Sequence, residues 1–199
     1  MDQDSELPEN YVNTLYNSFK KLTVLHELIA GVGPLSKNKN NDDIYLFNQN
    51  NNEEIIAVSE TLSSGFMTSA KVYKLVGKRD ENLFIDYVDW EWNWRAKSKN
   101  LTTFVDTNLI INHMLGDGHK SIFIWKVGIP NPIRHYYQYR NSFILLKYSY
   151  VPFIWKLKRI IVNIVKLLIY VLFFDQKIKR FKYIYLGIKD FFMNKKGKL

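Results

Sequence analysis

A chain of 199 residues is long enough to bury one medium-sized core and to carry an appendage, and its 47% hydrophobic and 16% aromatic content argues against disorder. It contains no cysteine, which excludes disulfide frameworks, zinc–thiolate sites and thiol nucleophiles. The first residues, MDQDSELPEN, are acidic and polar and do not have the pattern of a secretory signal.

The net charge of +9 is divided unevenly along the chain. Residues 134–199 hold 15 basic residues against two acidic ones, Asp175 and Asp190, a net of +13. Subtracting these from the totals of 28 and 19 leaves 13 basic and 17 acidic residues in 1–133, a net of −4. An acid-leaning body suits a metal or small-molecule site, whereas a cationic tail suits a phosphate-rich surface, either lipid or nucleic acid.

In the first part of the chain, the pattern predicts helices and strands in alternation. Helices are expected over 8–27, 69–75 and 87–99, the second of them ended by Gly77. Strands are expected over 28–34, within 55–68, and over 83–85, 102–105, 109–112 and 121–127. Residues 36–54 predict an irregular loop with room for one strand. This alternation indicates an α/β body over residues 1–130.

After Pro130-Asn131-Pro132 the pattern predicts a helical tail over residues 131–199. Helices are expected over 133–148, 153–173 and 176–193. The second helix carries a narrow polar stripe among apolar residues: Lys156, Arg159, Asn163 and Lys166. The most apolar stretch, 160–174, is shorter than the ~20 residues that a membrane-spanning helix needs. The tail is therefore expected to lie in a membrane interface rather than to cross it.

Three groups of residues are candidates for chemistry. Asp2 and Asp4 are two residues apart and can face one hard cation, although an acidic, helix-capping N-terminus has the same pattern. Asp86, Asp89 and Glu91 lie at a predicted helix start, where they either complement the helix dipole or supply a general base. His113 ends an apolar strand, either as a structural histidine or as the nitrogen ligand of a manganese site.

The alternating tryptophans Trp90, Trp92 and Trp94 cannot all share one helix face. Packing in the core is the expected role for them, with stacking on a sugar ring open to one.

The order of these pieces resembles the bacterial rhamnosyltransferase group of family 2 glycosyltransferases. The pieces are DQDS (2–5), SSGFM (63–67), LFIDYVD (83–89) followed by EW (91–92) and RA (95–96), His113 with LGD (115–117), and RHYY (134–137) with RN (140–141). The resemblance extends over nearly the whole chain. It implies a GT-A fold, a Rossmann-like α/β layer that binds a nucleotide-sugar.

The resemblance also implies roles for individual residues. Asp2 and Asp4 match the D-x-D motif that holds Mn²⁺ or Mg²⁺ and touches the donor, and His113 matches a position that ligates the metal in relatives. Asp89 matches the catalytic base, and Glu91 the acid that follows it. Ser64 and Gly65 match the loop beside the donor sugar.

Three departures from the family pattern stand out. Val88 occupies the place of a frequent acid, Gly77-Lys78-Arg79 replaces a Gly-Gly-Phe, and the family's first strands, which precede the D-x-D, are absent before Asp2. The resemblance thus predicts an incomplete GT-A body followed by a basic amphipathic helical tail. A chain lacking those strands is expected to bind nucleotide-sugar weakly by itself.

The expected reaction is an inverting, metal-dependent transfer of rhamnose or a similar sugar from a dTDP-sugar to a polysaccharide or lipid-linked acceptor. Arg134, Tyr137 and Arg140 are candidates for contact with a lipid diphosphate. The expected location is cytoplasmic, on the inner face of the bacterial plasma membrane, held by its anionic surface.

Two alternatives remain open: a non-catalytic, membrane-binding remnant, and a nucleic-acid-binding protein. We expect no nucleic-acid partner, because the aromatic residues of the tail fall mostly on apolar helix faces rather than beside the lysines.

Overall fold

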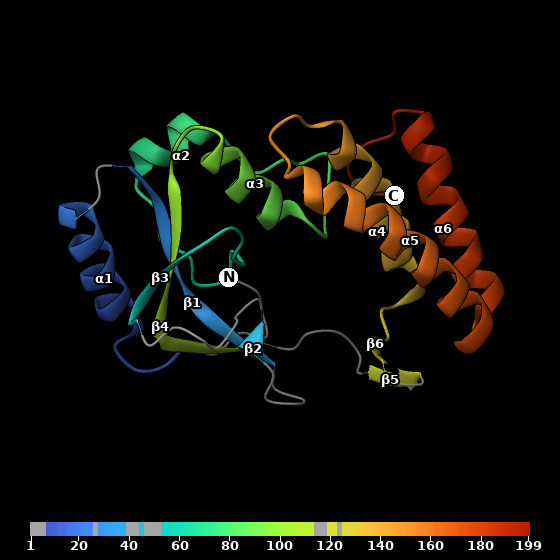
Figure 1. The fold of residues 1–199 in the computed structure, drawn as a ribbon, viewed down its shortest axis with the longest axis horizontal. Helices are drawn as coiled ribbons and strands as arrows, with labels where there is room; N and C mark the ends of the chain where they lie inside the picture. The colour runs from blue at the N-terminus through green and yellow to red at the C-terminus, as the bar shows by residue number, and fades with distance from the viewer. Residues whose placement is uncertain (1–6, 26–27, 39–43, 46–52, 114–118, 123–124) are drawn as a thin grey trace. The chain divides into compact units, whose positions relative to one another are not determined.

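The computed structural model describes residues 7–25, 28–38, 44–45, 53–113, 119–122 and 125–199, and of residues 38, 45, 113, 119, 120, 122, 125 and 126 it describes the backbone alone. The chain divides into two compact units (Figure 1). Unit 1 comprises residues 1–79 and 92–115, and unit 2 comprises residues 80–91 and 116–199.

Unit 1 is a small mixed sheet with helices on both faces. Its strands are β1 (Ile29–Asn38), β2 (Ile44–Tyr45), β3 (Ile55–Val58) and β4 (Thr102–His113), in the order β2-β1-β4-β3. The central pair, β1 and β4, is parallel, and both outer strands are antiparallel to their neighbours. The α/β class predicted from the alternation of helices and strands is confirmed.

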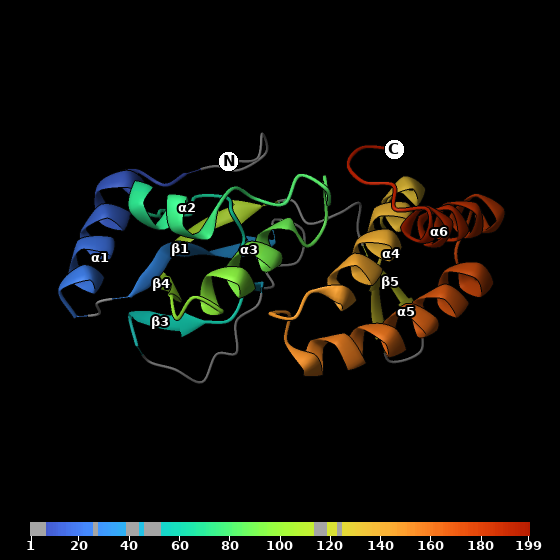
Figure 2. The same ribbon diagram turned by 90° about the horizontal axis from the view of Figure 1, so that it is seen from above.

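Helix α1 (Tyr11–Leu25) covers one face of this sheet, where it buries Tyr11, Leu15 and Leu22 against side chains of β1 and β4. Helices α2 (Ala70–Val76) and α3 (Val88–Lys97) cover the other face, with Val76 and Trp92 in the shared core (Figure 2). The boundary between the two units falls within α3, after Glu91.

The predicted helix ended by Gly77 is confirmed as α2. The Ser69 hydroxyl accepts a hydrogen bond from the amide of Val72 at 3.1 Å, which satisfies a free N–H of the first turn. Gly77 follows the helix with φ 93°, a conformation that glycine adopts without steric cost.

The strands predicted over 102–105 and 109–112 are one strand, β4. The register against β1 shifts between Pro34 and Leu35, which pair with Asp106 and Ile110. The irregularity lies at residues 107–109, where the amide of Thr107 donates to the carbonyl of Glu54 at 2.8 Å. A bulge of this kind continues a strand while redirecting its side chains.

Unit 2 contains a β-hairpin and the three helices of the tail. The hairpin joins β5 (His119–Ile122) to β6 (Trp125–Gly128), and the helices are α4 (Pro132–Lys147), α5 (Phe153–Phe173) and α6 (Lys177–Phe192) (Figure 1). All three predicted helices are confirmed within two residues at each end. Helices α4 and α6 pass close together at Gly187, where an added Cβ would lie 2.4 Å from the carbonyl oxygen of Tyr136.

The strand predicted over 83–85 is wrong. This stretch forms tight turns, in which the amides of Leu83 and Phe84 donate to the carbonyls of Asp80 and Glu81 at 3.1 and 3.3 Å. Its apolar residues match a strand locally, but its carbonyl groups are bonded by side chains of α4, described below.

Within the described residues, no helix combines the length and the hydropathy required to cross a lipid bilayer.

Candidate functional site

The predicted base follows a segment of unit 2, residues 82–87, whose backbone is held by two side chains of α4. The Arg140 Nη2 group donates to the carbonyls of Asn82 and Leu83 at 3.0 and 3.2 Å. The Asn141 amide donates to the carbonyls of Leu83 and Ile85 at 2.8 and 2.6 Å. Because both side chains are fully buried, these bonds are shielded from competition by water.

Three residues of this segment adopt left-handed backbone conformations. Phe84, Asp86 and Tyr87 have φ values of 62°, 63° and 67°. Each such residue other than glycine costs roughly 1–2 kcal/mol, so the surrounding structure must stabilise it. The carbonyl of Asp86 is a third acceptor for Asn141, at 3.3 Å. The Asp86 carboxylate pairs with Arg134 through bonds of 2.5 and 3.4 Å.

Helix α3 begins directly after this segment, with Asp89 and Glu91 in its first turn. Asp89 is half-buried, whereas Glu91 is only 1% exposed. One Glu91 oxygen accepts a hydrogen bond of 2.5 Å from the Tyr150 hydroxyl. Both carboxylates lie at the positive end of the helix dipole. Of the two, Asp89 is the more exposed, while Glu91 lies in a buried hydrogen-bonded pair.

The alternating tryptophans differ in exposure. Trp92 and Trp94 are fully buried, and their indole N–H groups donate to the Gly77 carbonyl at 2.9 Å and to Glu60 at 2.8 Å. The packing role expected for these two is confirmed. Trp90 is half-buried and its ring centre lies 5.8 Å from that of Tyr87, so stacking on a sugar ring stays a prediction for it.

The candidates for a lipid diphosphate behave differently from one another. Arg134 keeps 39% of its side chain exposed while it pairs with Asp86. Tyr137 is 4% exposed, and its hydroxyl accepts a bond from the amide of Leu199 at 3.0 Å. Arg140 is 0% exposed, and its Nη1 donates to the carbonyl of Gly197 at 2.7 Å. Arg134 is thus the only one of the three with substantial exposure, and contact with a lipid diphosphate stays a prediction.

Ser64 and Gly65, the predicted donor loop, belong to unit 1. Ser64 is 1% exposed, and Gly65 has φ 71°. The Gly65 carbonyl accepts a bond of 2.6 Å from the Tyr11 hydroxyl, and burial followed by the charge of Asp106 raises the pKa of that hydroxyl. A Cβ at position 65 would lie 2.2 Å from the Tyr11 oxygen, so α1 and the loop require glycine there.

The predicted metal ligands are not described. Asp2 and Asp4 lie outside the described residues, and His113 ends β4 with a described backbone alone. The residues that the structure does describe contain no group of three histidine, aspartate or glutamate side chains suited to a metal ion. The metal therefore stays a prediction based on the sequence.

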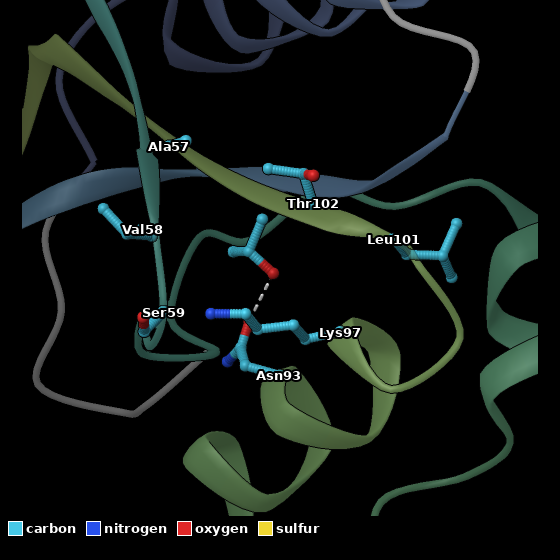
Figure 3. A pocket seen from close by; sticks show the side chains of 8 residues that line it. Ala57, Val58, Ser59, Asn93, Lys97, Leu101 and Thr102 are labelled. Atoms are coloured by element: carbon cyan, nitrogen blue, oxygen red, sulfur yellow. Dashed lines mark hydrogen bonds between the residues drawn. The ribbon is translucent and has the colours of Figure 1, made fainter. Parts of the chain in front are cut away.

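Unit 1 also holds two small pockets that none of the predicted site residues line. The first, of about 180 Å³, is lined by Ser59, Asn93 and Lys97 among others (Figure 3). The Asn93 side chain accepts a bond of 2.9 Å from the Thr103 hydroxyl and is buried.

The second pocket, of about 280 Å³, is lined by residues of α1, of β3 and of the bulge in β4. In it Ser18 donates to Asp106 at 2.5 Å. Lys21 also lines it and pairs with Glu54 at 3.6 Å on the surface. Charged and polar groups in these two pockets thus bond to one another.

Sequence reasoning did not assign roles to Asn141 or Tyr150. Asn141 belongs to the Arg140-Asn141 pair of the family resemblance, which was a usable signal. Tyr150 lies between two helices in no motif, and its bond to Glu91 spans 59 residues, so the sequence offered no sign of it.

No family model and no solved structure matches the chain. It is similar to the dTDP-rhamnosyl transferase RfbF of Shigella flexneri, with 38% identity over 109 residues. The match covers 54% of this chain and 36% of that protein, so the chain spans about a third of the length of the curated relative. This partial likeness supports a glycosyltransferase of the rhamnosyltransferase kind.

Proposed function

We propose that the chain is part of a transferase that moves rhamnose or a similar deoxysugar from a dTDP-sugar to a polysaccharide or lipid-linked acceptor. The likeness to a dTDP-rhamnosyl transferase supports the donor class, and the α/β architecture of unit 1 is compatible with a GT-A body. The observation that carries the proposal is the half-buried Asp89 in the first turn of α3, behind a segment fixed by Arg140 and Asn141.

In the proposed reaction, Asp89 accepts the proton of the acceptor hydroxyl, whose oxygen attacks the anomeric carbon. The bond to the donor diphosphate breaks on the opposite side of the sugar, which inverts the anomeric configuration. A general base must be held in a fixed position, and the bonded segment 82–87 does this for Asp89. Glu91 keeps the first turn in place through Tyr150.

A divalent metal ion, Mn²⁺ or Mg²⁺, would neutralise the charge of the departing diphosphate when bound. Asp2 and Asp4, with His113 as a nitrogen donor, are the ligands we propose for it.

We further propose that the enzyme works on an anionic membrane surface. Helix α5 exposes a line of large apolar side chains at helical spacing along its whole length: Phe153, Leu157, Ile161, Ile164, Leu168 and Leu172. Solvent-exposed apolar stripes of this length are typical of helices that lie in a lipid interface, and neighbouring lysines such as Lys158 suit anionic headgroups. The same stripe favours the alternative function, a non-catalytic membrane-binding protein, because it supports membrane binding without any catalysis.

The test of the base is Asp89→Asn in a longer form that carries a nucleotide-binding segment before Asp2. The substitution keeps the size of the side chain and removes the proton acceptor. Transfer of labelled rhamnose from dTDP-rhamnose should fall by about 10²–10⁴-fold. Donor affinity, measured by calorimetry with Mn²⁺, should stay within about twofold.

The matched control is Glu81→Gln, which removes an exposed carboxylate eight residues earlier. It should leave transfer unchanged. If Asp89→Asn keeps half of the wild-type rate, Asp89 is not the base, and membrane binding without transfer in the longer form would favour the non-catalytic alternative.

A further inference from the structure

Helix α5 holds a guanidinium group against two aromatic rings, and this group has no hydrogen-bond partner among the described residues. The Arg159 guanidinium carbon lies 5.0 Å from the ring centre of Tyr87 and 5.0 Å from that of Trp155. The two rings lie 5.7 Å apart and nearly perpendicular. Within the described residues Arg159 makes no hydrogen bond or ion pair, and its Nε atom is buried. The rings therefore fix the group, while its N–H donors find no acceptor among the described residues.

A second cation lies on the same face of α5, two turns later. Lys166 is half-buried, and among the described residues its ammonium group has no hydrogen-bond or ion-pair partner. Burial and the charge of Arg159 lower its pKa, and the charge of Asp86 acts in the opposite direction. Two cations that repel each other at a partly desolvated position destabilise the free protein.

Asp86, whose charge acts on Lys166, is already engaged. Asp86 forms its ion pair with Arg134, so the four groups Asp86, Arg134, Arg159 and Lys166 together carry a net charge of +2. A planar guanidinium matches two oxygens of one phosphate group, and an ammonium supplies a point charge for another. A ligand with two adjacent anionic groups satisfies both sets of donors.

We propose that Arg159 and Lys166, beside the Asp86–Arg134 pair, form a binding site for a diphosphate group. The diphosphate belongs either to a soluble nucleoside diphosphate or to a lipid-linked diphosphate, because both present the same anionic oxygens. Arg134 was a candidate for a lipid diphosphate in the sequence, whereas Arg159 and Lys166 were not assigned that role. It stands on the side-chain contacts of unit 2 and does not require that the chain be a transferase.

The test uses the whole chain with inorganic pyrophosphate as the probe, measured by calorimetry and by thermal unfolding. Pyrophosphate should bind and raise the unfolding temperature, with inorganic phosphate binding more weakly. Lys166→Met removes the charge and keeps the length of the side chain. It should weaken pyrophosphate binding by roughly tenfold or more, while raising the unfolding temperature of the ligand-free protein. A purely structural lysine would give the opposite change in stability.

Lys182→Met, at an exposed position of α6, is the matched control and should change neither property. Lys166→Arg should retain binding, because it keeps the charge. If Lys166→Met does not fold, Arg159→Gln takes its place with the same expected loss of binding. The proposal is overturned if pyrophosphate does not bind the wild-type chain, or if Lys182→Met weakens binding as much as the variants of the site.

Two further ligands distinguish the sources of the diphosphate. If dTDP competes with pyrophosphate for the wild-type chain, and Lys166→Met abolishes this competition, the diphosphate belongs to a soluble nucleotide. If vesicles that contain a polyprenyl diphosphate compete with pyrophosphate, and vesicles without it do not, the diphosphate belongs to a lipid carrier.

Discussion

At the scale of single residues, His135 is a buried base that folding keeps neutral. It is 0% exposed, and its Nε2 lies 2.9 Å from Arg180 Nη1. Because arginine can only donate, Nε2 accepts this bond and the proton is on Nδ1. Burial, then the charges of Arg180 and Lys166, lowers the pKa of His135 to about 3 from its ordinary value of 6.5.

This depressed pKa predicts that acid destabilises the chain. Between pH 6.5 and about 3 the unfolded chain binds a proton at His135 that the folded chain does not, so stability falls as the pH is lowered. The slope is about 1.4 kcal/mol per pH unit, or about 2 kcal/mol between pH 6.5 and 5. His135→Gln keeps an acceptor for Arg180 and should remove this part of the pH dependence.

Urea unfolding at pH 5, 6 and 7 measures the effect. The difference in unfolding free energy between the wild type and His135→Gln should shrink or reverse as the pH falls. If the unfolding free energies of the two proteins change in parallel with pH, protonation of the His135 imidazole does not destabilise the folded chain.

Some features of the candidate site could be predicted from the sequence and others could not, and the difference lies in individual residues. Asp89 and Glu91 were candidates because they lie at a predicted helix start, and the family resemblance assigned them their roles as base and following acid. The burial of Glu91 could not be predicted, since it depends on Tyr150, 59 residues away. Arg140 was expected to face a ligand or solvent, yet its carbonyl partners lie 57 and 58 residues earlier and bury it.

At the scale of elements, α5 has its polar side inside unit 2 and its apolar side in solvent. Asn163 is buried and donates to the Ser142 hydroxyl at 2.8 Å, and its carbonyl accepts a bond of 2.7 Å from Tyr139. On the opposite side Ile161 and Leu168 are 63% and 55% exposed. Asn163 of the polar stripe therefore packs against α4, and the apolar surface on the opposite side is free to meet a lipid interface.

This inverted arrangement predicts membrane binding that depends on the exposed stripe. The double variant Ile161→Gln and Leu168→Gln adds no charge and changes exposed positions, so folding should be little affected. Burying each aliphatic side chain in lipid contributes about 1.5–3 kcal/mol, so co-sedimentation with anionic vesicles should weaken by at least roughly tenfold. Raising the salt concentration should weaken it further, since surface charges are screened over about 8 Å at physiological ionic strength.

Val24→Gln is the control, because Val24 is an exposed aliphatic residue (81%) on α1 of unit 1. It should bind vesicles as the wild type does. Equal binding to neutral and anionic vesicles at every salt concentration would rule out the electrostatic contribution, and unchanged binding of the double variant would exclude the stripe.

The elements themselves were largely predictable from local patterns. Helices α4, α5 and α6 follow from their apolar periodicity, and α2 follows from Ser69 and Gly77 at its ends. The stretch 83–85 was not predictable, because its strand-like residues are held in turns by distant side chains of α4. Local propensity fails where long-range hydrogen bonds take up the backbone carbonyls.

At the scale of the whole molecule, each unit is assembled from two separate stretches of the chain. Unit 2 takes residues 80–91 from the middle of the sequence, and these residues supply the carbonyl partners of Arg140 and Asn141. The helical tail predicted from the sequence comprises residues 131–199. A fragment of these residues lacks the carbonyl partners of Arg140 and Asn141. Leaving a buried guanidinium and amide without acceptors costs about 1–3 kcal/mol for each group, and more for the charged one.

We therefore predict that the 131–199 fragment retains helical content but loses a cooperative unfolding transition. Circular dichroism at 222 nm during urea titration compares it with the whole chain and with a fragment of residues 80–199. The longer fragment should recover a sharp transition. The same midpoint in both fragments would mean that the three helices are stable without residues 80–91.

The divided composition of unit 2 also has a consequence for the order of synthesis on the ribosome. All residues of unit 1 have been made once residue 115 is added, whereas Asn82 and Leu83 wait for Arg140 and Asn141, 58 residues later. At 5–20 residues per second this interval lasts roughly 3–12 s. During it the apolar sequence Leu83-Phe84-Ile85 has none of its final side-chain partners from α4, so it is the part of unit 2 that a chaperone on the nascent chain would bind first.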